Sequence, residues 1–432
     1  GNEKLRSFRV IIFFLLLVIS SCSYFDEEEE ILPGERQNVF DFDDDVIIKS
    51  NQKILISKSK SIEFWSQQYQ NKRNHLFHFK SKSTLKLKKK LKINDIAFDK
   101  IDHVTIPVFS NQNIFYADNN FYIFSKELDK GKIIWQTQLK KEKKEKLPFI
   151  GGFALDENIL FITTGLGNVY AVNAKNGEIL WSKNFLVQFS RPPLVHKAKV
   201  YVVSDDNQTF ALNSKKGDLL WSHSGNLEEV SIIGGSKPII QKNILVVSYS
   251  SGEIYALNAN DGTLIWFDNI TSGNFFSKSP LNDIQSPLSI VGNMIFVPTF
   301  SDKFIVYELE NGNEIWNLKI SSVNPAVISG STAYVIDTSG RLLCLDKNSG
   351  KLLWAVQLRI SSNGEEITWY GPLLSSNKLL LGNSKGLVIS ISPFTGRLLS
   401  KINFSEEIIA NPIHLGEKII IITKEGSLFI LG

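Results

Sequence analysis

Few side chains in this 432-residue chain stand at spacings that support catalysis or metal binding. Of the six histidines only His75 and His78 lie close together, and on a lysine-rich stretch such a pair is more typical of solvated side chains than of metal ligands. Asp205 and Asp206 form one acidic pair in a predicted hairpin turn. The chain has no G-x-S-x-G pattern and no phosphate-binding loop, and GGSK at 234–237 indicates the start of a strand instead. These patterns do not indicate an enzyme.

Cys22 is the one residue placed for covalent chemistry. Three basic residues precede the apolar run 10–19, and Cys22 closes the stretch ISSC. A basic start, a short apolar run and small residues before a cleavage point are typical of a secretory signal, whereas a membrane span needs roughly twenty apolar residues. The stretch resembles the bacterial lipobox, in which the cysteine is lipidated and becomes the mature N-terminus. We therefore expect a signal peptide at 1–21; a soluble periplasmic protein cleaved near residue 22 is the alternative.

The segment 22–54 is predicted to be an acidic tether. Five consecutive acidic residues at 26–30 and a second acidic cluster at 41–45 repel one another and bury little surface. An interaction tail is the alternative interpretation. The formal net charge of the whole chain, +4, gives no indication of a nucleic-acid partner. The only other cysteine, Cys344, is most simply a small buried hydrophobic residue.

Along the rest of the chain one phrase recurs: a glycine followed four residues later by tryptophan. Compare GNVYAVNAKNGEILW at 167–181 with GEIYALNANDGTLIW at 252–266. Successive endings are 46, 40, 45, 50, 38 and 46 residues apart, with Ser400 in place of the last tryptophan, and this is the length of one four-stranded propeller blade. Each unit alternates as β-strands do and contains a turn glycine. The sequence predicts an all-β fold over 55–432.

The tryptophans are predicted to dock each blade onto the next. An indole buries roughly 150–250 Å², and a blade alone cannot bury both of its faces. A small or modest side chain stands ten residues before each ending, which allows neighbouring sheets to approach. The predicted docking residues are Trp65, Trp135, Trp181, Trp221, Trp266, Trp316 and Trp354.

The two ends of the chain are expected to share one blade. Three strands follow Ser400 and no fourth, so an N-terminal strand must complete the last sheet. We expect SIEFW at 61–65 to supply it, which gives eight blades of four antiparallel strands and leaves only short, protected edges.

At the phrase A-x-N-x-x-[N/D]-G-x-x-x-W, seen at 171–181 and 256–266, the repeat resembles that of pyrroloquinoline-quinone-type propellers. With the lipobox and short-looped blades, the chain resembles the BamB family, lipoprotein subunits of the outer-membrane β-barrel assembly machinery. This resemblance implies a non-enzymatic scaffold without a cofactor. Ser23 after the cysteine implies delivery to the outer membrane, with the ring facing the periplasm.

The resemblance also implies partners, namely the periplasmic domains of BamA and possible unfolded outer-membrane protein clients. The family contacts BamA through an apolar-x-apolar-Arg-Gly stretch and a Ser-Asp-x-Asp stretch, which match VSIIG at 230–234 and NDIQ at 282–285. Ile233 replaces the expected arginine and Gln285 replaces the second acid, so each stretch lacks one charge. The residues carried over are Val230, Ile232, Ile233, Asp283 and Gln285.

Two other functions remain open from the sequence. A quinone-dependent periplasmic dehydrogenase would share the repeat, but those enzymes resemble longer chains with adjacent cysteines, and neither cysteine here has such a neighbour. A ligand-binding propeller unrelated to barrel assembly is the third possibility. Of the lysine-rich stretches, LKLKKKLK at 85–92 is interpreted as a solvated loop or an edge, and its alternation also fits a two-faced strand or a dock for an acidic partner.

Overall fold

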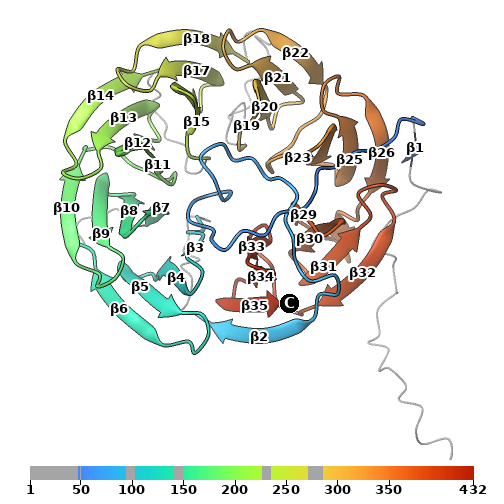
Figure 1. Ribbon diagram of the computed structural model, residues 1–432, viewed down its shortest axis with the longest axis horizontal. Coiled ribbons are helices and arrows are strands. Elements are labelled where there is room, and N and C mark those ends of the chain that lie inside the picture. The colour runs from blue at the N-terminus through green and yellow to red at the C-terminus, as the bar shows by residue number, and fades with distance from the viewer. Residues whose placement is uncertain (1–46, 49, 94–102, 141–148, 226–234, 271–285) are drawn as a thin grey trace, which may run out of the picture. The chain divides into compact units, whose positions relative to one another are not determined.

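The computed structural model describes residues 47–48, 50–93, 103–140, 149–225, 235–270 and 286–432. Among these residues all regular elements are strands, so none of them forms a helix capable of crossing a membrane. The strands form eight four-stranded antiparallel blades arranged in a ring (Figure 1). The predicted eight-bladed β-propeller is confirmed.

In seven blades the strands follow one another from the centre of the ring outward. The first four are β3 (Val108–Phe109), β4 (Asn113–Ala117), β5 (Tyr122–Glu127) and β6 (Ile133–Gln138); β7 (Ile150–Asp156), β8 (Ile159–Thr164), β9 (Asn168–Asn173) and β10 (Ile179–Asn184); β11 (Leu194–His196), β12 (Lys199–Val203), β13 (Gln208–Asn213) and β14 (Leu219–Ser224); and β15 (Ile239–Gln241), β16 (Ile244–Ser248), β17 (Glu253–Asn258) and β18 (Leu264–Asn269).

The next three are β19 (Ser289–Val291), β20 (Met294–Pro298), β21 (Phe304–Glu308) and β22 (Glu314–Leu318); β23 (Val327–Ser329), β24 (Thr332–Ile336), β25 (Arg341–Asp346) and β26 (Leu352–Gln357); and β29 (Trp369–Ser375), β30 (Lys378–Asn383), β31 (Leu387–Ile391) and β32 (Leu398–Asn403). A short hairpin of β27 (Ser361–Ser362) and β28 (Glu365–Glu366) links the last two of these blades, and β1 (Ile47–Ile48) pairs with β26 as a fifth strand.

The eighth blade joins the two ends of the fold, as predicted, but with a different N-terminal strand. β33 (Ile413–Leu415), β34 (Lys418–Ile422) and β35 (Ser427–Leu431) are completed by β2 (Leu87–Lys92), which pairs antiparallel with β35. The expectation for 61–65 was wrong. The stretch 85–92 contains this edge strand, as one interpretation of it expected: Leu91 is buried, whereas Leu87, Lys88 and Lys90 are exposed to solvent at the outer edge.

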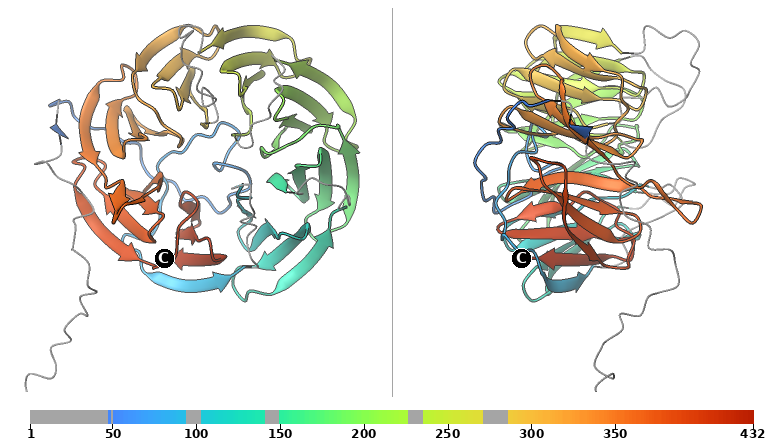
Figure 2. Two further views of the ribbon diagram at one scale, coloured as in Figure 1. Left: turned by 180° about the vertical axis from the view of Figure 1, so that it is seen from behind. Right: turned by 90° about the vertical axis from the view of Figure 1, so that its right-hand side faces the viewer.

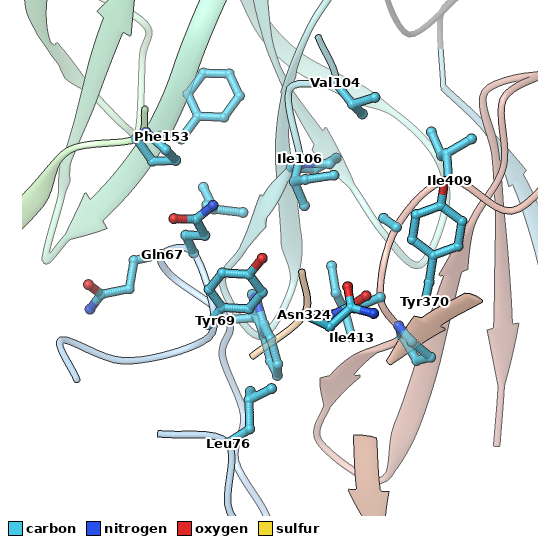
Figure 3. A pocket seen from close by; sticks show the side chains of 18 of the residues that line it. Gln67, Tyr69, Leu76, Val104, Ile106, Phe153, Asn324, Tyr370, Ile409 and Ile413 are labelled. Atoms are coloured by element: carbon cyan, nitrogen blue, oxygen red, sulfur yellow. The ribbon is translucent and has the colours of Figure 1, made fainter. Parts of the chain in front are cut away.

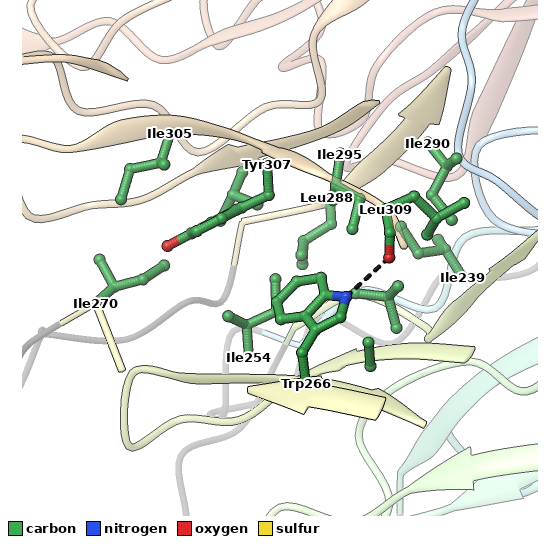
Figure 4. Packing of buried hydrophobic residues seen from close by; sticks show 13 residues of the cluster. Ile239, Ile254, Trp266, Ile270, Leu288, Ile290, Ile295, Ile305, Tyr307 and Leu309 are labelled. Carbon is green, nitrogen blue, oxygen red and sulfur yellow. Dashed lines mark hydrogen bonds between the residues drawn. The ribbon is translucent and has the colours of Figure 1, made fainter. Parts of the chain in front are cut away.

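Six tryptophans occupy the interfaces between successive blades. Each lies opposite the residue ten positions earlier, for example Ala256 opposite Trp266, and its indole N–H donates to a turn carbonyl of the next blade. Trp266 donates to the Leu309 carbonyl at 2.8 Å within a cluster of aliphatic side chains (Figure 4). The other five are Trp135, Trp181, Trp221, Trp316 and Trp354, bonded to the carbonyls of Ala174, Ser214, Ala259, Lys347 and Pro393.

The recurring glycine has a second purpose beyond its positive φ. Gly312 stands in a turn of the blade that receives Trp266, and a Cβ at Gly312 would lie 2.5 Å from the indole. The glycine of one repeat thus makes room for the tryptophan of the preceding repeat. The two interfaces beside the eighth blade lack an indole, because Ser400 stands at one and Leu91, against Gly131, at the other.

Trp65 does not dock blades, contrary to the prediction. Its backbone exchanges hydrogen bonds with Phe109 of the innermost strand β3, at 2.9 and 2.7 Å, and its buried ring lies 5.8 Å from that of Phe79. The residue lies in a segment that crosses the centre of the ring rather than on an outer strand, because the outer position is taken by β2.

Candidate functional site: the two faces and the centre of the ring

The segment 60–81, which we call the strap, covers the centre of one face of the ring. Figures 1 and 2 show it in blue, along the face opposite the β27–β28 hairpin. We call these the strap face and the connection face. The connection face carries the links from the outer strand of one blade to the inner strand of the next.

The strap is fixed by backbone hydrogen bonds to seven blades. They join it to the innermost strand of a blade or to the turn that follows that strand. The bonded pairs are Trp65 with Phe109, Ser66 with Leu155, Lys72 with Ile240, Arg73 with Ile290, Leu76 with Ile328, Phe79 with Leu374, and Ile62 with Gly416.

Histidine side chains add further bonds between the strap and the ring. His75 Nε2 lies 2.9 Å from the Ile328 carbonyl, and the Asn377 N–H donates to His78 Nε2 at 3.0 Å. The prediction that His75 and His78 are solvated was wrong, because His78 is buried and burial lowers the pKa of both rings, that of His75 to about 4. On the ring, His414 stacks on Phe79, with centroids 4.9 Å apart.

These buried imidazoles predict acid sensitivity. Burial lowers the pKa of His414 from 6.5 to about 4, so between these pH values the unfolded chain binds more protons. The contribution of His414 to stability is therefore full above about pH 6.5 and falls as the pH drops toward 4. His414→Phe should remove up to about 3 kcal/mol of that loss, measured as the difference in unfolding free energy between pH 7 and pH 4.5.

Asp205 also titrates in this pH range and contributes in the opposite direction. Because Asp205 is present in both proteins, comparing the variant with the parent chain isolates the contribution of His414. Burial raises the pKa of Asp205 to about 6, so its contribution to stability grows as the pH falls from about 6 toward 3.8. An unchanged pH dependence in the His414→Phe variant would show that the buried ring does not titrate with unfolding.

A fully buried lysine also holds the strap. Lys237, which precedes β15, donates through Nζ to the Asn71 carbonyl at 2.8 Å and to Asn74 Oδ1. Asn74 in turn donates to the Leu288 carbonyl at 3.0 Å. Burial lowers the pKa of Lys237 well below its usual value. GGSK does lead into a strand, as predicted, but the buried lysine was not foreseen from sequence.

Between the strap and the segments that lead into the inner strands lies a cavity of about 280 Å³. Figure 3 shows Tyr69 and Leu76 of the strap facing Phe153, Ile106 and Tyr370 across it. The remaining lining residues are apolar or neutral and polar: Trp65, Gln67, Gln68, His103, Val104, Pro107, Val108, Gly151, Ser190, Pro192, Gly235, Asn324, Pro372, Ile409, Ala410, Asn411, Pro412 and Ile413.

This lining does not fit a quinone held on a divalent cation. Such a cation needs carboxylate oxygens, and the described residues that line the cavity include no aspartate or glutamate. Nor do the described residues contain a cluster of three His, Cys, Asp or Glu side chains able to hold a metal ion. Cys344 is buried opposite Trp354, and burial raises the pKa of its thiol. The described lining of the cavity therefore offers no ligands for such a cation.

On the connection face a buried polar network surrounds one of the links between blades. Asp205, in the β12–β13 turn, accepts hydrogen bonds from Ser190 at 2.5 Å and Gln188 at 2.7 Å. The guanidinium of Arg191 donates to the Ser248 carbonyl at 2.6 Å, and a Cβ at Gly235 would lie 2.8 Å from its Nε. Gly235 therefore packs directly against the Arg191 side chain.

The residues carried over as partner contacts lie outside the described residues, but the flanks of both stretches are described. Gly225 and Gly235 flank the stretch with Val230, Ile232 and Ile233, and Ile270 and Ser286 flank the one with Asp283 and Gln285. The Gly225 N–H donates to Asn207 at 2.9 Å, the Ile270 N–H donates to Gly252 at 2.9 Å, and the Ser286 hydroxyl donates to Ser322 at 2.6 Å. Both links leave consecutive blades on the connection face. Cys22 also lies outside the described residues.

Comparison with known proteins agrees with this architecture. Residues 122–356 and 344–431 match the sequence profile of the family described as "Outer membrane protein assembly factor BamB". The chain belongs to the BamB family. The BamB of Moranella endobia is 23% identical over 326 residues, covering 74% of this chain and 83% of that protein.

Solved structures share the BamB-like fold. The crystal structure of BamB from Moraxella catarrhalis superposes with a TM-score of 0.68 at 16% identity, covering 81% of this chain and 99% of that one. A quinohemoprotein alcohol dehydrogenase from Comamonas testosteroni gives a TM-score of 0.67 at 12% identity, covering 86% and 81%. Because enzymes and assembly factors share the ring, the fold alone does not decide between them.

Proposed function

We propose that this chain is a non-enzymatic assembly factor for outer-membrane β-barrel proteins. In this role it is anchored to the outer membrane by lipid on Cys22, faces the periplasm and binds the periplasmic domains of BamA. Membership of the BamB family supports the assembly role. The described lining of the cavity, which includes no carboxylate, supports a binding protein rather than a quinone-dependent dehydrogenase.

One observation supports the partner surface most directly. The links that contain 230–233 and 283–285 leave consecutive blades on the same face, and their described flanks are fixed by hydrogen bonds to the ring. The described residues at the ends of both stretches are therefore held on one face of two neighbouring blades. The chain acts as a scaffold that holds its partner through this face.

The partner proposal is tested by affinity purification of the full-length protein from native membranes. BamA should be recovered with the parent chain, and Asp283→Arg should reduce its recovery. The matched charge reversal Glu178→Arg, on an exposed turn of the strap face, should leave recovery unchanged. Equal recovery with both variants contradicts the assignment of the surface, and absence of BamA from the parent sample contradicts the proposed partner.

The anchor has a separate test. Cys22→Ala should move nearly all of the protein from the membrane fraction to the periplasmic fraction, because stable attachment depends on acyl chains carried by that cysteine. Cell fractionation measures membrane attachment, and labelling with a radioactive fatty acid measures acylation of the protein. Cys344→Ala serves as the control, since that thiol is buried between strands. Unchanged fractionation of the Cys22 variant would refute lipidation as the tether.

A further inference from the structure

In four blades the outer strand exposes two neighbouring aliphatic side chains just before the docking tryptophan. The second member of the pair is 46%, 46%, 46% and 42% exposed at Ile134, Leu180, Leu220 and Ile265. Ile315 and Leu399 hold the same position in two further blades and are also exposed. Polar residues usually protect the outer edge of a sheet from pairing with other chains. These edges are apolar instead.

The blade β23–β26 differs from these, because its equivalent aliphatic residue is buried and a further strand lies beside it. In the blade β23–β26 the equivalent residue, Leu353, is only 2% exposed. This is also the blade whose outer strand carries a fifth strand among the described residues, since β1 pairs antiparallel with β26. The register joins Ile47 to Ala355 and Ile48 to Trp354, immediately after Leu353. The chain therefore contains an example of strand addition at the apolar position.

We propose that the open outer edges of the other blades bind extended polypeptide segments with adjacent aliphatic residues, by the same strand addition that β1 makes on β26. The proposal deepens the proposed function, on which it rests, by assigning unfolded client polypeptides to these edges. Backbone N–H and C=O groups of the outer strand give the pairing, and the exposed aliphatic pair gives the preference for apolar segments.

The blade closed by β2 supplies an internal contrast. Its outer strand carries lysines at 88, 89, 90 and 92 in place of the aliphatic pair. Lysine on an edge strand opposes pairing with another chain. The open edges assigned to client segments are those of β6, β10, β14, β18, β22 and β32.

The test uses the full-length protein and a fluorescent peptide that copies residues 44–50, DDVIIKS. Fluorescence anisotropy should show binding at more than one site per chain. The same peptide with both isoleucine amides N-methylated keeps its side chains but loses N–H donors, and its affinity should fall at least about tenfold. A peptide with both isoleucines replaced by serine should also bind weakly.

Two protein variants locate the sites. The triple change Leu180→Lys, Leu220→Lys and Ile265→Lys alters exposed side chains and should roughly halve the number of sites while thermal stability is retained. The double change Ile47→Pro and Ile48→Pro prevents β1 from pairing, frees the edge of β26 and should add one site.

The proposal is overturned by absence of binding, by equal binding of the N-methylated peptide, or by an unchanged number of sites in the lysine variant. Self-association of the protein that depends on the same three residues would assign the edges to a second copy and would also overturn it. The peptide assay contains no BamA, so its result is separable from the purification test. Loss of BamA recovery with intact peptide binding would contradict only the partner proposed above.

Discussion

Trp266→Ala is expected to lower the free energy of unfolding by about 3–5 kcal/mol, the range for truncation of a large aromatic side chain in a core. The indole is 8% exposed and packs between two blades against Ile254, Ile295 and Leu309. The substitution also removes the N–H that satisfies the Leu309 carbonyl at 2.8 Å. Truncation therefore opens a cavity between blades and leaves a buried acceptor unpaired.

Chemical denaturation of the parent and variant measures this loss. Phe267→Ala is the matched control, because Phe267 is the next residue of the same strand and is 52% exposed. The control should lose less than about 1 kcal/mol, as exposed positions usually do. Equal losses for the two variants would mean that the indole does not connect the blades.

Much of the ring could be predicted because its repeat is local. The glycine-to-tryptophan spacing, the alternation of apolar residues and the small residue opposite each indole recur along the chain, and each is determined within one blade. The number of blades follows from counting these units. Eight blades with a shared last sheet were therefore predictable from sequence.

The closure and the strap were not predictable in the same way, because they depend on contacts between distant segments. Residues 61–65 and 87–92 both have strand-like character, and only the pairing of Leu91 with Leu428 identifies the strand that closes the ring. The strap has no repeat, and blades that lie far away in sequence bury His78 and partly bury His75. A run of Phe77, His78 and Phe79 amid lysines is the one feature of the sequence that could have indicated this burial.

For the surface predicted to bind a partner, too, some features could be predicted from the sequence and others could not. The structure shows that the described residues flanking the two stretches follow the outer strands of neighbouring blades, because the repeats have equal topology. It does not describe Ile233 or Gln285, where the sequence departs from the pattern of the family. The buried network of Arg191 and Asp205 was not predicted, because the sequence indicated only that Asp205 and Asp206 form an acidic pair in a hairpin turn.

The second large effect is expected at a residue with no side chain. Gly312→Ala should cost about 3 kcal/mol or more, because two penalties add. A φ of +72° is unfavourable for alanine by about 1–2 kcal/mol, and the new Cβ would meet Trp266 at 2.5 Å. Gly292→Ala is the matched control, since Gly292 has a φ of +59° and a Cβ added there would meet nothing within 4 Å.

The excess of the Gly312 loss over the Gly292 loss measures the contact with the indole. In a Trp266→Ala background that excess should disappear, because the alanine at 312 then enters the space that the ring has left. Equal costs for the two glycine variants in the parent chain, or an excess that persists without the indole, would contradict the pairing of Trp266 with the glycine of the following repeat. The recurring motif is thus a joint between neighbours, in which each repeat supplies a tryptophan to the next blade and a glycine to the previous one.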